Sequence, residues 1–252
     1  MILRRITTHL RKQEWTAIAI DFVIVVIGVF VGIQLGNWNE ARLERAQAAV
    51  FTRALEADLQ ADAVTYRGVA GYYASVRDNA ERVLESLEGG APLSDEDFLI
   101  SAYRASQVAL VPVNRSTFEE LVSTGRINLI TDAALRRTAI EHFGFNYIEA
   151  AADDGRQSDY RSLFRGTMPP DAHRAARERC GDVASTDIVA LDYHCVLGLS
   201  DEAILQAAEA LRAEPAMPAA LRSRINELDV QTRDLITRAA RLERVLSPDA
   251  QP

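Results

Sequence analysis

The side chains best suited to acid–base or metal chemistry are carboxylates that accompany a histidine in the middle of the chain. Glu141 and His142 are adjacent in a segment with the apolar spacing of an amphipathic helix. Such a pair could supply a general base or a metal ligand. The carboxylates that could join them are Glu119, Glu120, Glu149, Asp153 and Asp154.

A plainer interpretation of the same pair is available. Adjacent residues on a helix point about 100° apart, and Glu-His pairs often arise by chance. The only lysine is Lys12, so the rest of the chain has neither a lysine nucleophile nor a phosphate-loop lysine. We therefore expect no enzyme, no cofactor, and no catalytic, cofactor-binding or metal residues. The alternative is an enzyme or ligand-binding receptor around Glu141 and His142, which predicts a pocket where these carboxylates converge on His142.

The two cysteines, Cys180 and Cys195, favour a disulfide if they lie in an oxidising compartment. Closing a loop of this length contributes about 3 kcal/mol in the loop-entropy model. Free thiols are the first alternative. A metal site that also uses His194 is the second, although two cysteines and one histidine do not give a recognisable zinc spacing.

A long apolar segment, residues 17–35, precedes all of these residues in the chain. As a helix, nineteen residues extend over roughly 28 Å, close to the ~30 Å hydrocarbon core of a bilayer. Trp15 and Trp38 flank the segment at the depths where such rings favour the headgroups. No small-x-small cleavage site follows, so an uncleaved signal-anchor is favoured over a signal peptide. A buried helix of a soluble protein would leave both tryptophans and the basic tail unexplained.

Flanking charge predicts the orientation of this anchor. Lys and Arg are in excess before the segment and balanced by acids after it, and an excess of basic residues stays in the cytoplasm. The N-terminus is therefore expected inside, and the chain after about Trp38 outside. In a bacterial cell this corresponds to the inner membrane and the periplasm. The basic residues before the segment are Arg4, Arg5, Arg11 and Lys12.

Three glycines inside the anchor, Gly28, Gly32 and Gly36, repeat every fourth residue and allow another helix to approach closely. Asp21 lies on the same face and is costly in lipid unless it is paired or close to the interface. One interpretation is helix–helix packing in the membrane, with a second copy or another membrane protein. The other is that Asp21 reaches the cytoplasmic headgroups and the glycines reflect ordinary transmembrane composition.

Charge restricts the partners of the rest of the chain. The whole sequence has 28 basic and 36 acidic side chains, and the first 38 residues hold four of the basic and two of the acidic ones. The remainder therefore has 24 basic and 34 acidic side chains, a net charge of −10. An acidic body of this kind is not expected to bind nucleic acid. The lipid bilayer is the partner that the sequence predicts directly.

The remaining pattern is helical, and we expect an all-α fold. One transmembrane helix continues into a long stalk helix, followed by an elongated helical bundle. Along the stalk, an apolar 4-3 stripe from Leu55 to Leu87 is broken only by Asp62, and a second stripe of small residues lies about 140° away. The last helix is expected to pack antiparallel on the stalk. The predicted parts are a basic tail 1–14, a transmembrane helix 15–38, an extracytoplasmic domain 39–248 with its stalk 39–88, and a disordered tail 249–252.

Local signals set the shorter helices. Ser94 and Ser200 are expected to cap helices, and Ser116 with Glu119 is expected to form a capping box. Ile140 is expected to face the core, and His173 to lie on a solvated face among arginines. Residues 181–199 are expected to be irregular.

Two motifs in the chain stand out. The first is Asp21, Val26-Ile27-Gly28-Val29, Gln34 and Asn37-Trp38-Asn39-Glu40, and the second is Thr117-Phe118-Glu119-Glu120-Leu121, Ser123, Gly125, Asn128-Leu129-Ile130 and Leu135. Together they resemble a widespread family of bacterial single-pass membrane proteins of uncharacterised activity. This chain differs in having Gly36 where that family commonly has asparagine. The resemblance implies membrane anchoring and transfers no functional residues.

These features together predict a non-catalytic, membrane-tethered helical module. Its role would be that of a scaffold, a sensor or a subunit of a larger envelope complex. The glycine stripe and the two-sided stalk favour a partner, whereas a monomer that uses both stalk stripes internally is the plainer alternative.

Overall fold

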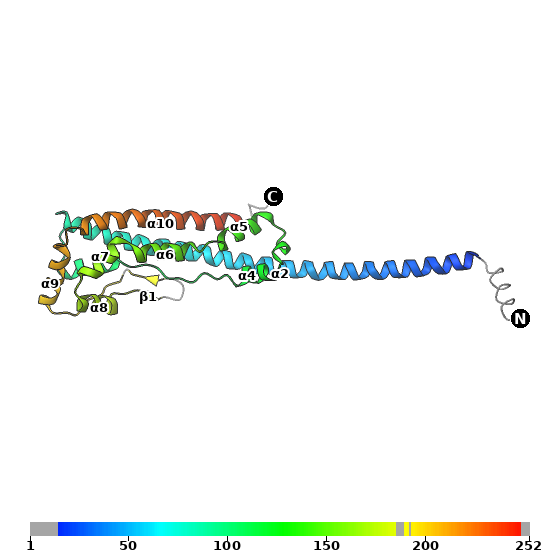
Figure 1. Ribbon diagram of the computed structural model, residues 1–252, viewed down its shortest axis with the longest axis horizontal. Helices are drawn as coiled ribbons and strands as arrows, with labels where there is room; N and C mark the ends of the chain where they lie inside the picture. Colours follow the sequence, from blue (N-terminus) through cyan, green and yellow to red (C-terminus); the bar gives the residue numbers. More distant parts are fainter. Residues whose placement is uncertain (1–14, 185–188, 192, 248–252) are drawn as a thin grey trace. The chain divides into compact units, whose positions relative to one another are not determined.

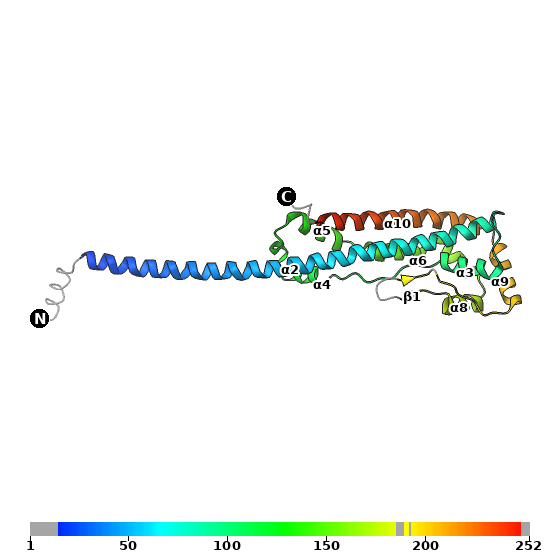
Figure 2. The same ribbon diagram turned by 180° about the vertical axis from the view of Figure 1, so that it is seen from behind.

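The computed structural model describes residues 15–184, 189–191 and 193–247, and its fold is all-α (Figure 1, Figure 2). The predictions made for the tails 1–14 and 249–252 lie outside the described residues. So do the side chain of Trp15 and any statement about residues 185–188.

Helices account for nearly all regular structure in the described chain. The elements, in order, are α2 (Trp15–Leu87), α3 (Asp95–Ala105), α4 (Ser116–Ser123), η1 (Ile127–Leu129), α5 (Ala133–Phe143), α6 (Tyr147–Gln157), α7 (Asp159–Thr167), α8 (Pro170–Arg179), β1 (Val183–Ala184), β2 (Val189–Ala190), α9 (Asp201–Arg212) and α10 (Met217–Leu246).

The chain divides into two compact units, residues 1–53 and 54–252. In the first unit, the described residues form the N-terminal part of α2. This helix is long and apolar enough to cross a membrane, and none of its apolar segment is buried. The second unit holds the remaining elements and the folded core.

In the second unit, α10 lies antiparallel along the C-terminal part of α2 (Figure 1, Figure 2). Three ion pairs join α10 to α2 and to Glu88, the residue that follows α2. The residue numbers of the partners on α10 decrease as those along α2 increase. Arg67 pairs with Glu243 at 2.5 Å, Arg77 with Asp229 at 3.2 Å, and Glu88 with Arg222. The predicted antiparallel packing is therefore confirmed.

The apolar stripe of α2 forms one wall of the core. Leu55, Leu59, Tyr73, Val76 and Val83 are all completely buried. By contrast, the second stripe is largely uncovered, since Ala57, Ala61, Val64 and Gly71 are exposed. Among the described residues, only one of the two predicted faces of this helix is therefore largely packed.

A buried cation fastens α10 to the end of α3. Arg224 is 1% exposed, and its guanidinium donates to the carbonyl oxygens of Gln107 at 3.0 Å and Ala105 at 3.5 Å. Gly155 makes room for it, because a Cβ there would meet the Val108 side chain at 2.6 Å and Arg224 at 3.2 Å. Carbonyl groups at a helix C-terminus lack intrahelical donors, and Arg224 donates the missing hydrogen bonds here.

Two of the three predicted capping sites are confirmed. Ser94 and Ser200 accept from the amides of Asp97 and Ala203, as expected. Gly89 adopts φ +85° directly after α2. The capping box at Ser116 is wrong, because Ser116 is already inside α4. Its amide donates to Asn114 instead.

Three further expectations need correction. Ile140 is 47% exposed, because its helix turns Phe143 and Ala139 toward the core instead. His173 is half-buried against the rings of Tyr103 and Phe164 and is not on a solvated face. The segment expected to be irregular contains the short antiparallel pair β1–β2.

Candidate functional site

A buried carboxylate–imidazole pair lies at the centre of the best candidate site. Asp62 Oδ2 and His142 Nε2 are 2.7 Å apart, and their side chains are only 4% and 5% exposed. Asp62 comes from α2 and His142 from the last turn of α5, which Asp132 begins by accepting from the amides of Ala134 and Leu135. When Asp62 is ionised it accepts the hydrogen of Nε2, and this fixes the imidazole tautomer.

Aromatic rings surround the pair. The rings of Tyr66 and Phe143 lie edge-on to His142, with centroids 5.3 and 4.7 Å away. Burial raises the pKa of Tyr66 to about 12; Arg238 opposes that rise and Asp62 adds to it. The imidazole is therefore fixed in orientation by an ionic partner and two rings.

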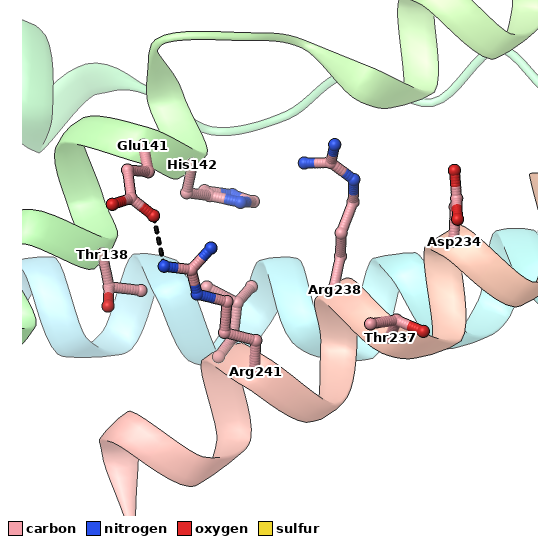
Figure 3. A pocket seen from close by; sticks show the side chains of 8 residues that line it. Thr138, Glu141, His142, Asp234, Thr237, Arg238 and Arg241 are labelled. Atoms are coloured by element: carbon pink, nitrogen blue, oxygen red, sulfur yellow. Dashed lines mark hydrogen bonds and ion pairs between the residues drawn. The ribbon is translucent and has the colours of Figure 1, made fainter.

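His142 also forms part of the wall of a cavity of about 270 Å³ between α5 and α10 (Figure 3). The cavity lies within the second unit, and its outer residues Thr237 and Arg241 are exposed. It is smaller than the roughly 300–1,000 Å³ that is typical for drug-sized ligands. Its lining residues are Thr138, Glu141, His142, Asp234, Thr237, Arg238, Arg241 and Leu242.

Two carboxylates and two guanidinium groups line this cavity, and they have different partners. Glu141 is already ion-paired with Arg241 across the cavity mouth (Figure 3). Asp234 and Arg238 instead both contact Tyr147: its hydroxyl donates to Asp234 at 3.0 Å, and the Arg238 guanidinium lies 4.3 Å over its ring. Within the described chain, neither Asp234 nor Arg238 forms an ion pair.

The predicted carboxylate cluster is only partly assembled. Glu141 and His142 line the same cavity, as the receptor alternative required. Glu119 lies near Arg115 at 3.5 Å, Glu149 accepts from Asn146, and Asp153 pairs with Arg156. Across residues 15–184, 189–191 and 193–247, no three side chains from His, Cys, Asp and Glu gather as a metal site.

Sequence reasoning missed three residues of this site. Asp62 gave a signal, since it was the single charged residue in an apolar stripe. Asp234 and Arg238 gave none, because acids and arginines recur along the whole of α10. Their position became visible only when α10 was placed beside α5.

The predicted disulfide between Cys180 and Cys195 is present, with Cα atoms 5.5 Å apart. Cys180 ends α8 and is fully buried. Arg104 donates to the Tyr193 carbonyl at 2.5 Å and contacts Cys195 Sγ at 3.5 Å. The Tyr72 hydroxyl donates to Asp182 at 3.0 Å in the same loop. These contacts connect Asp182 to α2, and Tyr193 and Cys195 to α3.

Apart from Trp15, whose side chain lies outside the described residues, the predicted membrane-contact residues are exposed on α2. A Cβ added at Gly28, Gly32 or Gly36 would meet no heavy atom within 4 Å, so this stripe is uncovered within the described chain. Asp21 is also exposed, and Trp38 is 61% exposed.

Comparison of the chain with protein-family models, with functionally curated proteins and with solved structures finds no match.

Proposed function

We propose that this chain is a single-pass, membrane-anchored helical module whose folded unit lies outside the cytoplasm, in the periplasm of a bacterial cell. Its N-terminus would be cytoplasmic. It would act without catalysis, as a scaffold, a sensor or a subunit of an envelope complex.

The observation that supports anchoring most directly is the uncovered apolar surface of α2. Between Ile20 and Leu35, all the large apolar side chains are at least 46% exposed. Leaving a dozen such side chains in water would cost on the order of 20 kcal/mol. A core helix of a soluble protein would bury this surface against its own chain, whereas a bilayer removes the cost without a protein partner.

Two further features support the orientation. The basic residues that precede the anchor favour a cytoplasmic N-terminus. The Cys180–Cys195 disulfide fits an oxidising compartment on the other side.

Protease digestion of bacterial spheroplasts tests the topology, using a chain tagged at both ends. The C-terminal tag should be lost, while the N-terminal tag should survive on a short membrane-bound fragment. Survival of the C-terminal tag in intact spheroplasts would reverse the orientation. An N-terminal tag absent from the membrane fraction would instead indicate a cleaved signal peptide. Replacing Arg4, Arg5, Arg11 and Lys12 by serine should increase the protected fraction.

Uncovered small-residue faces support a role that involves a partner. The glycine stripe and the exposed Ala57, Ala61, Val64 and Gly71 are left unpacked by this chain. Such surfaces let helices approach closely. The partner would be a second copy or another membrane protein.

The detergent-solubilised chain is purified with any protein that accompanies it in a fixed ratio, and light scattering measures the mass of the complex. This tests the role that involves a partner. Gly32→Leu should reduce association at least tenfold, because it fills the stripe. Phe30→Leu is the matched control, since position 30 lies on the opposite side of the helix. A wild-type mass of one chain, with no stoichiometric partner, would contradict the scaffold and subunit roles.

A second candidate is a ligand-binding receptor or an enzyme around Glu141 and His142. The cavity between α5 and α10 favours it, because both residues line one space and His142 is held by Asp62. Its two guanidinium groups and fixed imidazole are better suited to holding a ligand than to attacking one. Among the described residues, no hydroxyl or thiol hydrogen-bonds to His142.

A further inference from the structure

The cavity between α5 and α10 has an unusual distribution of unpaired charge. Asp234 and Arg238 are four residues apart on α10, a spacing at which an acid followed by a base commonly forms an ion pair. Here they form none, although both line the same cavity. Figure 3 shows the two side chains extending from α10 in the same direction.

Tyr147 is the reason that Asp234 and Arg238 stay apart. Its ring lies under the Arg238 guanidinium, at 4.3 Å, and its hydroxyl donates to Asp234 Oδ2 at 3.0 Å. A stacked guanidinium still presents its N–H groups at the edge of its plane, and a carboxylate that accepts one hydrogen bond has capacity for more. The cavity therefore offers one available cation and one available anion.

The remaining walls restrict which ligand fits. Glu141 and Arg241 neutralise each other, so the lining is balanced in charge as a whole. A doubly charged anion such as phosphate would face the carboxylates of Glu141 and Asp234. A ligand with no net charge but separated positive and negative groups avoids that repulsion and satisfies both free side chains.

We propose that this cavity binds a free α-amino acid with a small uncharged side chain, whose carboxylate is held by Arg238 and whose ammonium group is held by Asp234. Arginine binds a carboxylate through two parallel N–H donors. Leu242 and the methyl groups of Thr138 and Thr237 provide a short apolar surface for the side chain. A volume of about 270 Å³ suits a ligand of this small size.

The buried pair beneath the cavity has a supporting part in this proposal. His142 forms one wall, and Figure 3 shows its ring extending toward Arg238. Asp62 holds that ring in place, with Oδ2 2.7 Å from Nε2. His142 therefore forms a fixed wall of the cavity beside Arg238.

This inference rests on the receptor candidate, and it does not depend on the membrane topology. A negative binding result would leave the anchored module standing, and a reversed topology in the protease experiment would leave the amino-acid site standing.

Isothermal titration calorimetry on the full chain in detergent micelles tests the proposal. The probes are glycine, L-alanine, L-serine, L-valine and L-leucine. Two single-charge analogues of L-alanine serve as comparisons: N-acetyl-L-alanine lacks the ammonium group, and L-alaninamide lacks the carboxylate. At least one amino acid should bind, and each analogue should bind at least tenfold more weakly than the parent.

Variants connect the binding to the cavity. Arg238→Gln and Asp234→Asn should each weaken amino-acid binding at least tenfold. Arg233→Gln, an exposed arginine on the same helix that does not line the cavity, should leave it unchanged. Thermal unfolding of each variant checks folding. Asp234→Asn retains an oxygen for the Tyr147 hydroxyl and provides the second test if Arg238→Gln unfolds.

Three results would overturn the proposal. The first is that none of the five amino acids binds. The second is that an analogue binds as well as its parent, since one of the two charged groups would then be unnecessary. The third is that binding persists in both folded cavity variants.

Discussion

Asp62 and His142 are 80 residues apart in the sequence, yet their side chains meet at 2.7 Å inside the helical core. Asp62 occupies a position on α2 where the pattern predicts an apolar residue, and His142 on α5 provides its hydrogen-bond partner. A buried polar group is costly unless it is hydrogen-bonded, so neither side chain is stable in this place without the other.

Removing one member of this pair should be more damaging than removing both. Asp62→Ala leaves the imidazole of His142 buried without its partner, and should lower the free energy of unfolding by about 3 kcal/mol. Asp62→Leu combined with His142→Phe replaces the pair by apolar side chains and should recover most of that loss. Circular dichroism during urea unfolding of the detergent-solubilised chain measures both. A double variant as unstable as Asp62→Ala would contradict the prediction that apolar side chains can replace the pair.

Whether a feature of this site can be predicted from the sequence depends on how far apart its interacting residues lie along the chain. The long apolar helix, the helical fold and the caps at Ser94 and Ser200 follow from composition, periodicity and residues within four positions, so the sequence indicates them. Asp62 and His142 could each be noticed, one as a break in a stripe and one as a candidate base. Their pairing could not, because it depends on how α5 folds back onto α2.

The same limit explains the residues that were missed. Arg224 looks like one of many arginines on α10, and its burial depends on Gly155 and on the end of α3. Asp234 and Arg238 match an ordinary i, i+4 ion pair, and only the position of Tyr147 separates them. Ile140 was assigned to the core from spacing alone, which does not fix the rotation of a short helix.

Arg224 should contribute more to stability than other arginines of α10. Arg224→Ala leaves the carbonyl oxygens of Ala105 and Gln107 without their donor. It should lower the free energy of unfolding by about 3 kcal/mol, because the lost hydrogen bonds come from a charged group. Arg222→Ala is the matched control. It removes an ion pair with Glu88 whose two side chains are 57% and 46% exposed, and pairs of that kind contribute roughly 1 kcal/mol or less. Urea unfolding of both variants tests the difference, and equal losses would contradict the anchoring role of Arg224.

The disulfide should stabilise the second unit by limiting the unfolded chain. Cys180 and Cys195 are 15 residues apart, for which the loop-entropy model gives about 3 kcal/mol. Adding a reducing agent should therefore lower the melting temperature of the wild-type chain. The double variant Cys180→Ala, Cys195→Ala should melt at the lower temperature with or without reductant. If reductant shifts the double variant as well, the effect does not arise from this bond.

His173 should make the stability of the second unit fall in mildly acidic solution. Burial, followed by Arg165, Arg177 and Arg161, holds the pKa of His173 below its ordinary value of 6.5. Between the folded and unfolded values the unfolded chain binds more protons, so stability is complete above about pH 6.5 and is lost as the pH decreases through the folded pKa. His173→Phe keeps ring contacts with Tyr103 and Phe164 but cannot be protonated, so its free energy of unfolding should change less between pH 7.5 and 5 than that of the wild type. The exposed His194, replaced by glutamine, serves as the control and should leave the wild-type slope intact. Identical slopes for wild type and His173→Phe would rule out His173 as the source of the pH dependence.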